Sequence, residues 1–312
     1  MTVMLLGRDR GHEFDLLRDA VRDHGESVVT VDVDEWPSDR PLTHDIEADR
    51  VRFGDRAFDI DEIQGVYVKA NSLFVPAIED GIDGCVSEDE NPFAALTQLR
   101  EYRGLCKGLL ASLEHHGVTV VPTHDALEWE ERTTYACDVY GSLGIDVPET
   151  VATVSSETAR SFLERHGRVV YKAIGGVGGA HVMTTDEADR LDDLTTPVLF
   201  QAFVPGEDVR AYVTDDTVVG AFKYTHDEAA FTFKNAPGGE IGADAVDLPV
   251  PVRRDVRRAV EAAPMAHSAV DLRRRPDGSY ALMETNPGGR FMLPDSAGIT
   301  DVADELAAYL VS

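Results

Sequence analysis

The chain has 312 residues and 43% of them are hydrophobic, a content that suits a globular protein with a sizeable core and is too high for a disordered one. It carries 29 Lys and Arg against 57 Asp and Glu, a net charge of −28, and no long basic stretch, which argues against nucleic acid as a direct partner. No run of 18 apolar residues occurs, so we expect no membrane span.

The beginning of the chain predicts a βαβ arrangement. The apolar start, 2–7, indicates a first strand rather than a signal peptide, since it ends in charged residues. Phe14, Leu17 and Val21 recur at helical spacing, and Gly25 ends that helix. The expected elements up to a boundary near Thr123 are strands at 2–7, 27–33, 65–69 and 118–121, a hairpin at 51–58, and helices at 13–24 and 98–116.

The remainder alternates strands and helices without repeats or long linkers, which favours an α/β chain or α+β lobes. We expect helices at 131–143, 155–166, 186–194 and 252–263 and from 299 onward, strands at 147–154, 168–173, 180–184, 198–204, 209–214 and 218–224, and a hairpin at 269–285. The predicted domains are 1–122, 123–198 and 199–312.

A glycine-rich turn follows the strand that ends in Lys172. Its glycines, Gly175, Gly176, Gly178 and Gly179, would let backbone N–H groups approach a phosphate, with Lys172 as a point charge. Neither a P-loop nor a dinucleotide fingerprint fits, because no GK[ST] follows and the next element is a strand. Taken alone, a simple hairpin tip is an equally good interpretation.

Two further segments carry polar groups at strand ends. The first contains Gln201, Phe203 and Val204, then a Pro-Gly turn, Asp208 and Arg210, and by itself favours an ordinary strand–turn–strand. In the second, adjacent antiparallel strands would bring Asp271 close to Glu284 and Asn286. Two carboxylates and an amide oxygen suit Mg²⁺, whereas the alternative is solvated strand-end acids.

In this order and spacing, the three segments resemble the ATP-grasp superfamily, and within it the carboxylate–amine ligases related to the ribosomal-protein glutamate ligases. The resemblance spans residues 122–312. It implies an ATP-grasp fold preceded by a βαβ pre-ATP-grasp domain at 1–122, a lid subdomain with the glycine-rich loop at 123–198, and a C-terminal subdomain with the magnesium site at 199–312.

The resemblance also implies roles for individual residues. Lys172 and the glycine-rich loop would bind the phosphates of ATP. The adenine pocket would be lined by Gln201, Phe203 and Val204, and Asp208 would bind the ribose. Asp271, Glu284 and Asn286 would hold one or two Mg²⁺ ions, with Mn²⁺ as a substitute. The candidate catalytic residues form three groups. Lys223 would face phosphate or substrate, and Lys234 and Asn235 would face the transferred phosphate. Arg210, Arg273 and Arg290 would anchor a substrate carboxylate or acyl phosphate.

One departure from the family pattern concerns a second phosphate-binding lysine. The segment where relatives carry it has no lysine here, and Arg132 is the candidate replacement. In the N-terminal domain, Lys69 and the residues 70–72 follow a strand at its carboxyl end, where substrate contacts or a simple loop are both consistent with the pattern.

The resulting hypothesis is an ATP- and Mg²⁺-dependent ligase that joins the carboxylate of a small molecule or peptide to an amine through an acyl phosphate. The alternatives are a small-molecule kinase on the same fold and a non-catalytic ATP-binding module. A homo-oligomer is implied by the relatives.

The cysteines and the acidic surface indicate the setting in which the chain works. Cys85, Cys106 and Cys137 are odd in number and widely spaced, which argues against a disulfide framework or zinc site and favours a reducing cytoplasm. Only five basic residues are lysines, and this composition resembles proteins of salt-rich cytoplasms, whose surface carboxylates keep the chain hydrated.

Overall fold

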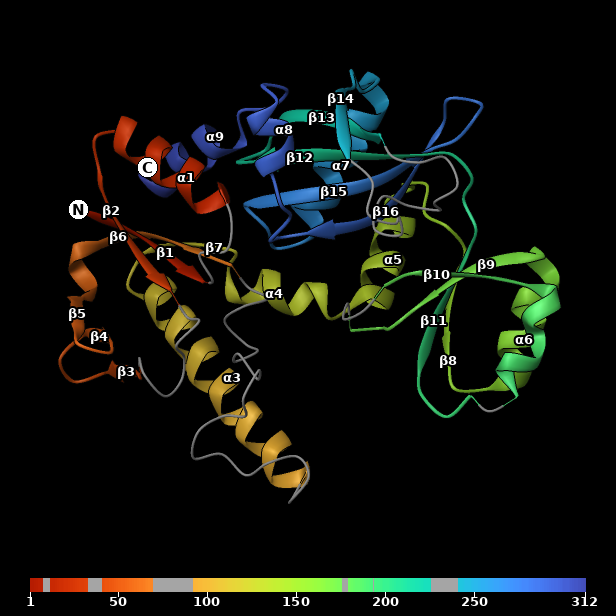
Figure 1. The fold of residues 1–312 in the computed structure, drawn as a ribbon, viewed down its shortest axis with the longest axis horizontal. Coiled ribbons are helices and arrows are strands. Elements are labelled where there is room, and N and C mark those ends of the chain that lie inside the picture. The colour runs from red at the N-terminus through yellow and green to blue at the C-terminus, as the bar shows by residue number, and fades with distance from the viewer. Residues whose placement is uncertain (8–11, 33–40, 70–91, 176–178, 193, 226–240) are drawn as a thin grey trace. The chain divides into compact units, whose positions relative to one another are not determined.

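The computed structural model describes all residues except 8–11, 33–40, 70–91, 176–178, 193 and 226–240. The described chain forms two compact units (Figure 1). The first contains 1–124, 290–292 and 301–312, and the second contains 125–289 and 293–300.

A parallel sheet organises the first unit, with strand order β2-β1-β6-β7. Its strands are β1 (Thr2–Gly7), β2 (Ser27–Asp32), β6 (Ile63–Val68) and β7 (Thr119–Val121). Both β1 and β6 are apolar runs with almost every side chain buried, as expected for central parallel strands that are covered on both faces. The helices of this unit are α1 (His12–Asp23), α3 (Pro92–His115), α9 (Val302–Leu310) and the short 3-10 helix η1 (Ile60–Glu62).

The C-terminal helix α9 belongs to this first unit, where it packs against α1, β6 and β7. Gln64 donates a side-chain hydrogen bond of 2.5 Å to the carbonyl of Val311. Gly65 allows the close approach, because a Cβ there would lie 2.4 Å from the carbonyl oxygen of Leu310. The last residues of the chain therefore complete the packing of β6.

A small antiparallel sheet, β3-β4-β5, also belongs to the first unit. Its strands are β3 (Leu42–Asp45), β4 (Arg50–Phe53) and β5 (Arg56–Asp59).

In the second unit, an antiparallel sheet of order β10-β9-β11-β8 packs on helix α6 (Ser156–His166). Its strands are β8 (Thr150–Thr153), β9 (Arg168–Lys172), β10 (His181–Thr184) and β11 (Val198–Ala202). The Ser155 hydroxyl accepts a hydrogen bond from the Thr158 amide and so caps α6. Phe162 and Leu163 of the helix meet Phe200 of the sheet in the core.

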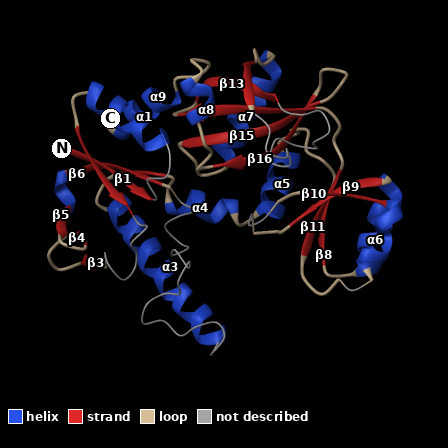
Figure 2. Ribbon diagram, in the orientation of Figure 1, coloured by secondary structure: helices blue, strands red, loops and turns tan. Residues whose placement is uncertain are grey.

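The larger sheet of the second unit has the order β14-β13-β12-β15-β16 and is antiparallel throughout (Figure 2). Its strands are β12 (Glu207–Thr214), β13 (Thr217–Thr225), β14 (Gly242–Ala245), β15 (His267–Arg274) and β16 (Tyr280–Asn286). The other elements of the second unit are α4 (His124–Glu130), which begins at the boundary, α5 (Thr133–Ser142), α7 (Val250–Ala262), α8 (Met292–Ser296) and the 3-10 helix η2 (Thr185–Leu191).

One face of this sheet is the apolar core. Val209, Ala211 and Val213 alternate along β12 and pack with the buried face of α7. On the same side, the Tyr140 hydroxyl links Trp129 Nε1 at 3.0 Å and the Thr285 hydroxyl at 2.7 Å. The opposite face of β12 carries Asp208 and Arg210, so the alternation of the strand separates core from polar site.

The α/β architecture expected from the sequence is confirmed, and several elements differ in detail. The short helix predicted over 186–194 is the 3-10 helix η2 (Thr185–Leu191), and α3 begins six residues earlier than the predicted 98. Four further elements, β3, β14, α4 and α8, were not among the predicted ones. The division at 122 and 198 stays a prediction; β11, which begins at Val198, pairs with β8 and β9.

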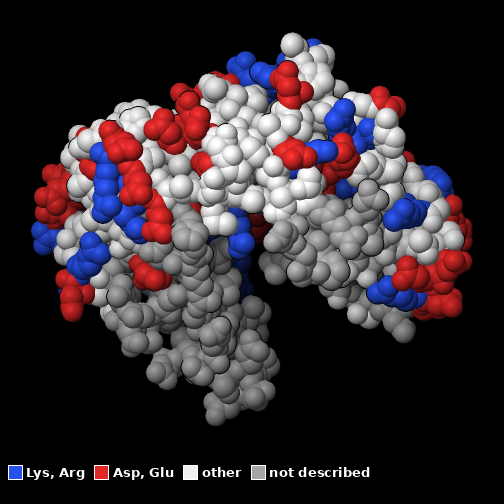
Figure 3. All heavy atoms as spheres, turned by 45° about the horizontal axis from the view of Figure 1, so that its top comes forward, with Lys and Arg blue, Asp and Glu red and all other residues white. Residues whose placement is uncertain are grey.

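The surface of the described residues carries many charges of both signs. Figure 3 shows acidic side chains on both units, interspersed with Lys and Arg. Among the described residues, no helix combines the length and apolar character that a membrane crossing requires.

Candidate nucleotide and metal site

Two ion pairs lie side by side on the polar face of the larger sheet. Arg210 on β12 and Asp271 on β15 are cross-strand partners, and Arg210 binds both carboxylate oxygens, with Nε to Oδ1 at 2.6 Å and Nη2 to Oδ2 at 2.8 Å. The second pair lies two residues away on the same two strands, where Arg273 on β15 donates to Asp208 Oδ1 on β12 at 2.7 Å. Asp271, expected to bind metal, and Asp208, expected to bind ribose, are therefore each held by a buried guanidinium.

Burial opposes the charge of Arg210 and lowers its pKa, but the attraction and hydrogen bonds of Asp271 outweigh this effect. The pKa of Arg210 consequently lies well above its usual value, and the guanidinium is permanently charged. The pairing orients the Asp271 carboxylate.

The three expected metal ligands lie on one face of the sheet. Asp271 is the direct partner of Glu284 on β16, and Asn286 is the partner of Ala269, two residues from Asp271. Lys172 Nζ, at the end of β9, lies 3.5 Å from Glu284 Oε2. The Asn286 side-chain oxygen accepts a hydrogen bond of 2.9 Å from the Gly288 amide.

This donor set fits Mg²⁺. It consists of hard oxygen ligands, and Mg²⁺ in nucleotide sites is typically held by one or two carboxylates together with phosphate oxygens and water. Among the described residues, no cluster of three or more His, Cys, Asp or Glu side chains suited to a metal is present. Asp271, Glu284 and the amide of Asn286 would thus share the ion with a polyphosphate rather than enclose it.

The expected phosphate-binding loop is described only in part. Gly175 and Gly179 flank it, whereas Gly176 and Gly178 lie outside the described residues. The Thr133 hydroxyl, at the start of α5, donates to the Ile174 carbonyl at 2.9 Å and so ties the start of the loop to that helix.

Gln201, expected in the adenine pocket, is buried and donates to the Thr150 hydroxyl at 3.1 Å. Its amide nitrogen also lies 3.9 Å from Cys137 Sγ. Burial raises the pKa of the Cys137 thiol, whereas Thr150 and Lys172 lower it. Cys137 therefore lies at the same site, although nothing in the sequence pattern identified it.

The segment after β11 is fixed by arginines. The Arg168 guanidinium stacks over the Phe203 ring at 3.6 Å from its centroid. The Val204 carbonyl accepts a hydrogen bond of 3.2 Å from Arg273 Nε, so Arg273 holds both this backbone and Asp208. Arg168 is a second contact that the sequence analysis missed; its position at the start of a predicted strand gave no chemical signal.

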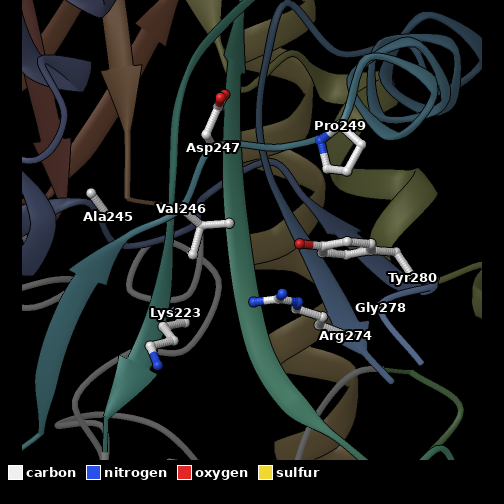
Figure 4. A pocket seen from close by; sticks show the side chains of 8 residues that line it. All are labelled: Lys223, Ala245, Val246, Asp247, Pro249, Arg274, Gly278 and Tyr280. Atoms are coloured by element: carbon white, nitrogen blue, oxygen red, sulfur yellow. The ribbon is translucent and has the colours of Figure 1, made fainter. Parts of the chain in front are cut away.

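Lys223 is not brought together with these residues. It is the cross-strand partner of Val209, so it faces the core side of the sheet, opposite to Arg210 and Asp271. It lies 3.4 Å from Glu207 and 3.7 Å from Asp244. Lys223 also lines a pocket of about 270 Å³. Figure 4 shows its side chain there together with Arg274 and Tyr280.

The sequence also predicted roles for Arg290, Lys234, Asn235 and Arg132. Arg290 belongs to the first unit, and Lys234 and Asn235 lie outside the described residues. Arg132, the candidate replacement for a phosphate-binding lysine, lies 3.5 Å from Glu128 and is largely exposed.

Comparison with known proteins gives two curated relatives. The chain is 30% identical over 112 residues to a glutathione synthetase of Synechocystis sp., covering 32% of this chain and 35% of the relative. It is 28% identical over 133 residues to a tetrahydromethanopterin:alpha-L-glutamate ligase of Methanosarcina acetivorans, and this match covers 36% of this chain and 41% of the relative. Each match thus spans well under half of the relative's length.

Solved structures match over nearly the full chain. The ATP-grasp ligase PsnB complexed with a minimal precursor has a TM-score of 0.80 at 22% identity and covers 99% of this chain and 98% of that one. The macrocyclase MdnC of Microcystis aeruginosa, bound with precursor peptide MdnA, has a TM-score of 0.80 at 18% identity. This match covers 100% of this chain and 99% of that one. At these identities the likeness establishes the fold.

The family model of the RimK-like ATP-grasp domain matches residues 134–310, which is more than half of the chain and includes Lys172, Asp271 and Glu284. The chain belongs to the RimK-like ATP-grasp family.

Proposed function

We propose that the protein is an ATP- and Mg²⁺-dependent carboxylate–amine ligase that acts on an amino acid or peptide. The observation that carries the proposal is the meeting of Lys172 with Glu284, beside Asp271 and Asn286 on one sheet face. A lysine next to paired oxygen ligands can hold a polyphosphate and its metal together.

In the proposed reaction, a carboxylate oxygen of the substrate attacks the γ-phosphorus of ATP, and the bond to the ADP oxygen breaks. An amine then attacks the acyl carbon, inorganic phosphate leaves, and the amine gives up a proton as the amide forms. When bound, Mg²⁺ would offset the negative charge of the phosphates. Lys172 would bind phosphate oxygens, and Asp208 would bind the ribose hydroxyls.

The peptide or amino-acid substrate is supported by the relatives. One curated relative is named for glutamate ligation, and several similar structures were solved with precursor peptides. A cytoplasmic location, expected from the cysteine pattern, is part of the same proposal.

The test is a screen for ADP release at high KCl with pairs of amino acids and peptides, followed by mass spectrometry of the products. Glu284→Gln should abolish ADP release, because it removes one charged oxygen ligand and the partner of Lys172. Glu149→Gln is the matched control, since Glu149 lies on the surface in a pair with Arg165. Full activity of Glu284→Gln would refute the metal assignment, and a stable phosphorylated product without an amide would indicate a kinase.

A further inference from the structure

One buried arginine joins two groups that are expected to contact the nucleoside of ATP. Arg273 Nε donates to the Val204 carbonyl at 3.2 Å, and Arg273 Nη1 donates to Asp208 Oδ1 at 2.7 Å. Val204 follows β11, which belongs to the four-stranded sheet of the second unit, whereas Asp208 lies on β12 of the five-stranded sheet (Figure 1). Arg273 therefore bridges the backbone expected at the adenine and the carboxylate expected at the ribose.

The turn between these two groups lies directly against β15, the strand that carries Arg273. Gly206, within the turn, has a φ of +135°, and a Cβ there would lie 1.9 Å from the carbonyl oxygen of Arg274. The side chains that pair across β12 and β15 are also buried, since Arg273 is 6% exposed and Asp208 is 13% exposed. The backbone contact and the ion pair together hold residues 204–208 against this strand.

The segment before the turn is held from its other end by β9. The Phe203 amide donates to the Arg168 carbonyl at 3.3 Å, and the Arg168 guanidinium stacks over the Phe203 ring. The hydrogen bond from Arg273 to Val204 is thus a second attachment of the same short segment, to a different strand. Because β15 also carries Asp271, this attachment connects the expected adenine-binding backbone to the strand of an expected metal ligand.

The chemistry of the guanidinium group suits this double attachment. Its planar fork presents several N–H groups in fixed directions, so one side chain can bind a carbonyl and a carboxylate at once. A lysine ammonium is a point charge on a flexible stem and lacks this fixed geometry. Since a buried ion pair is weak evidence for a contribution to stability, the arrangement points to positioning as the function of Arg273.

We propose that Arg273 is a positioning residue for the nucleoside, which holds the Val204 backbone and the Asp208 carboxylate at one fixed separation, so that base and ribose are bound together. The proposal rests on the proposed function for the identity of the ligand, ATP. It gives Arg273 a different role from the anchoring of a substrate carboxylate that the family resemblance implies. Positioning acts on ATP binding in the absence of any carboxylate substrate, whereas anchoring does not.

The experiment is calorimetric titration of the full chain with ATP and with 2′,3′-dideoxy-ATP, in potassium and magnesium chloride and without a carboxylate substrate. The dideoxy nucleotide lacks both ribose hydroxyls, so it cannot donate hydrogen bonds to Asp208. The wild type should bind ATP more tightly than the dideoxy nucleotide by about tenfold or more, the usual effect of hydrogen bonds to a charged group. The ratio of the two dissociation constants therefore measures the contribution of the ribose contact.

Arg273→Met should weaken ATP binding by about ten- to a hundredfold, because Val204 and Asp208 both lose the group that holds them. It should also bring the ratio of the dissociation constants toward one, since the carboxylate is no longer oriented for the ribose. Arg273→Lys keeps the charge but not the fork, and both effects should be present and smaller. Arg274→Met is the matched control: this neighbouring arginine is 44% exposed and lies 3.6 Å from Glu207, so both dissociation constants should stay unchanged.

The ratio distinguishes positioning from a purely structural role, which would weaken the binding of both nucleotides equally. The proposal is overturned if the wild type binds the two nucleotides equally, or if Arg273→Met keeps the wild-type ratio. If Arg273→Met fails to fold, the same criterion applies to Arg273→Lys. Unchanged ATP binding with a raised KM for the carboxylate substrate would overturn it in favour of anchoring.

The two proposals can fail separately. If the nucleotide ratios behave as expected while no substrate pair releases ADP, the ligase assignment fails and the role of Arg273 stands. If the wild type releases ADP with a substrate pair while the ratio is unchanged in the Arg273 variants, the role of Arg273 fails and the ligase assignment stands. A wild type that binds neither nucleotide would refute both.

Discussion

Replacing Arg210 with Met isolates the energetic role of the pair it forms with Asp271. The side chains of Arg210 and Asp271 are 5% and 17% exposed, so removal of the guanidinium leaves a carboxylate in a largely buried position without its counter-charge. The two hydrogen bonds, of 2.6 and 2.8 Å, are charge-assisted and are each worth about 1.5–3 kcal/mol. We therefore expect the free energy of unfolding to fall by about 3–5 kcal/mol, the usual range for breaking a buried pair.

The assay is urea unfolding of the full chain followed by far-ultraviolet circular dichroism. Arg165→Met is the matched control: Arg165 pairs with Glu149 at 2.7 Å, yet both side chains are more than half exposed. A surface pair of this kind contributes about 0–1 kcal/mol. The difference between the two variants therefore measures the effect of burial.

A double variant tests the cause of the loss. If Arg210→Met is destabilised because the Asp271 charge is left uncompensated, Arg210→Met combined with Asp271→Leu should recover much of the stability, since both charges are then gone. The reasoning is refuted if Arg210→Met unfolds within about 1 kcal/mol of the wild type, as an exposed pair would. It is also refuted if the double variant is less stable than the single one.

Two further predictions concern other parts of the molecule. Burial raises the pKa of the Cys106 thiol from 9.0 to about 12, so the unfolded chain loses this proton first as the pH rises. This group should therefore lower the free energy of unfolding above pH 9 by about 1.4 kcal/mol per pH unit. Urea unfolding below and above pH 9 should show that this free energy declines less steeply with pH in Cys106→Ala than in the wild type. An equal dependence on pH in both proteins would contradict the assignment. Gly206→Ala should be strongly destabilising, because the residue has a φ of +135° and a Cβ would lie 1.9 Å from the Arg274 carbonyl oxygen. Gly104→Ala, within α3 and with nothing within 4 Å, should instead stabilise by about 0.5–1 kcal/mol, and equal unfolding midpoints for the two variants would refute this contrast.

Local patterns were enough to predict two central strands and the first helix of the first unit. The apolar runs of β1 and β6 and the helical spacing of α1 are properties of short segments, and the structure has these elements within one or two residues of the predicted bounds. The short elements β3, β14 and α8, of four or five residues, have too few residues to show a period.

Pairing between distant segments was beyond the sequence. Asp271, Glu284 and Asn286 could be grouped because they belong to one hairpin. The ion pair of Arg210 with Asp271 depends on the register between β12 and β15, which begin 60 residues apart. The same register, together with that of β13, decides that Lys223 faces away from Arg210.

The return of the C-terminal segment to the first unit has a consequence for synthesis on the ribosome. Residues 125–289, the main part of the second unit, emerge as one continuous stretch and can begin folding as they appear. The first unit, although translated earlier, must wait for Phe291 and α9, because α1 and β6 pack against residues near position 310. The nascent N-terminal sheet is therefore left with an uncovered apolar surface during most of translation, and a fragment ending at residue 124 would retain it permanently.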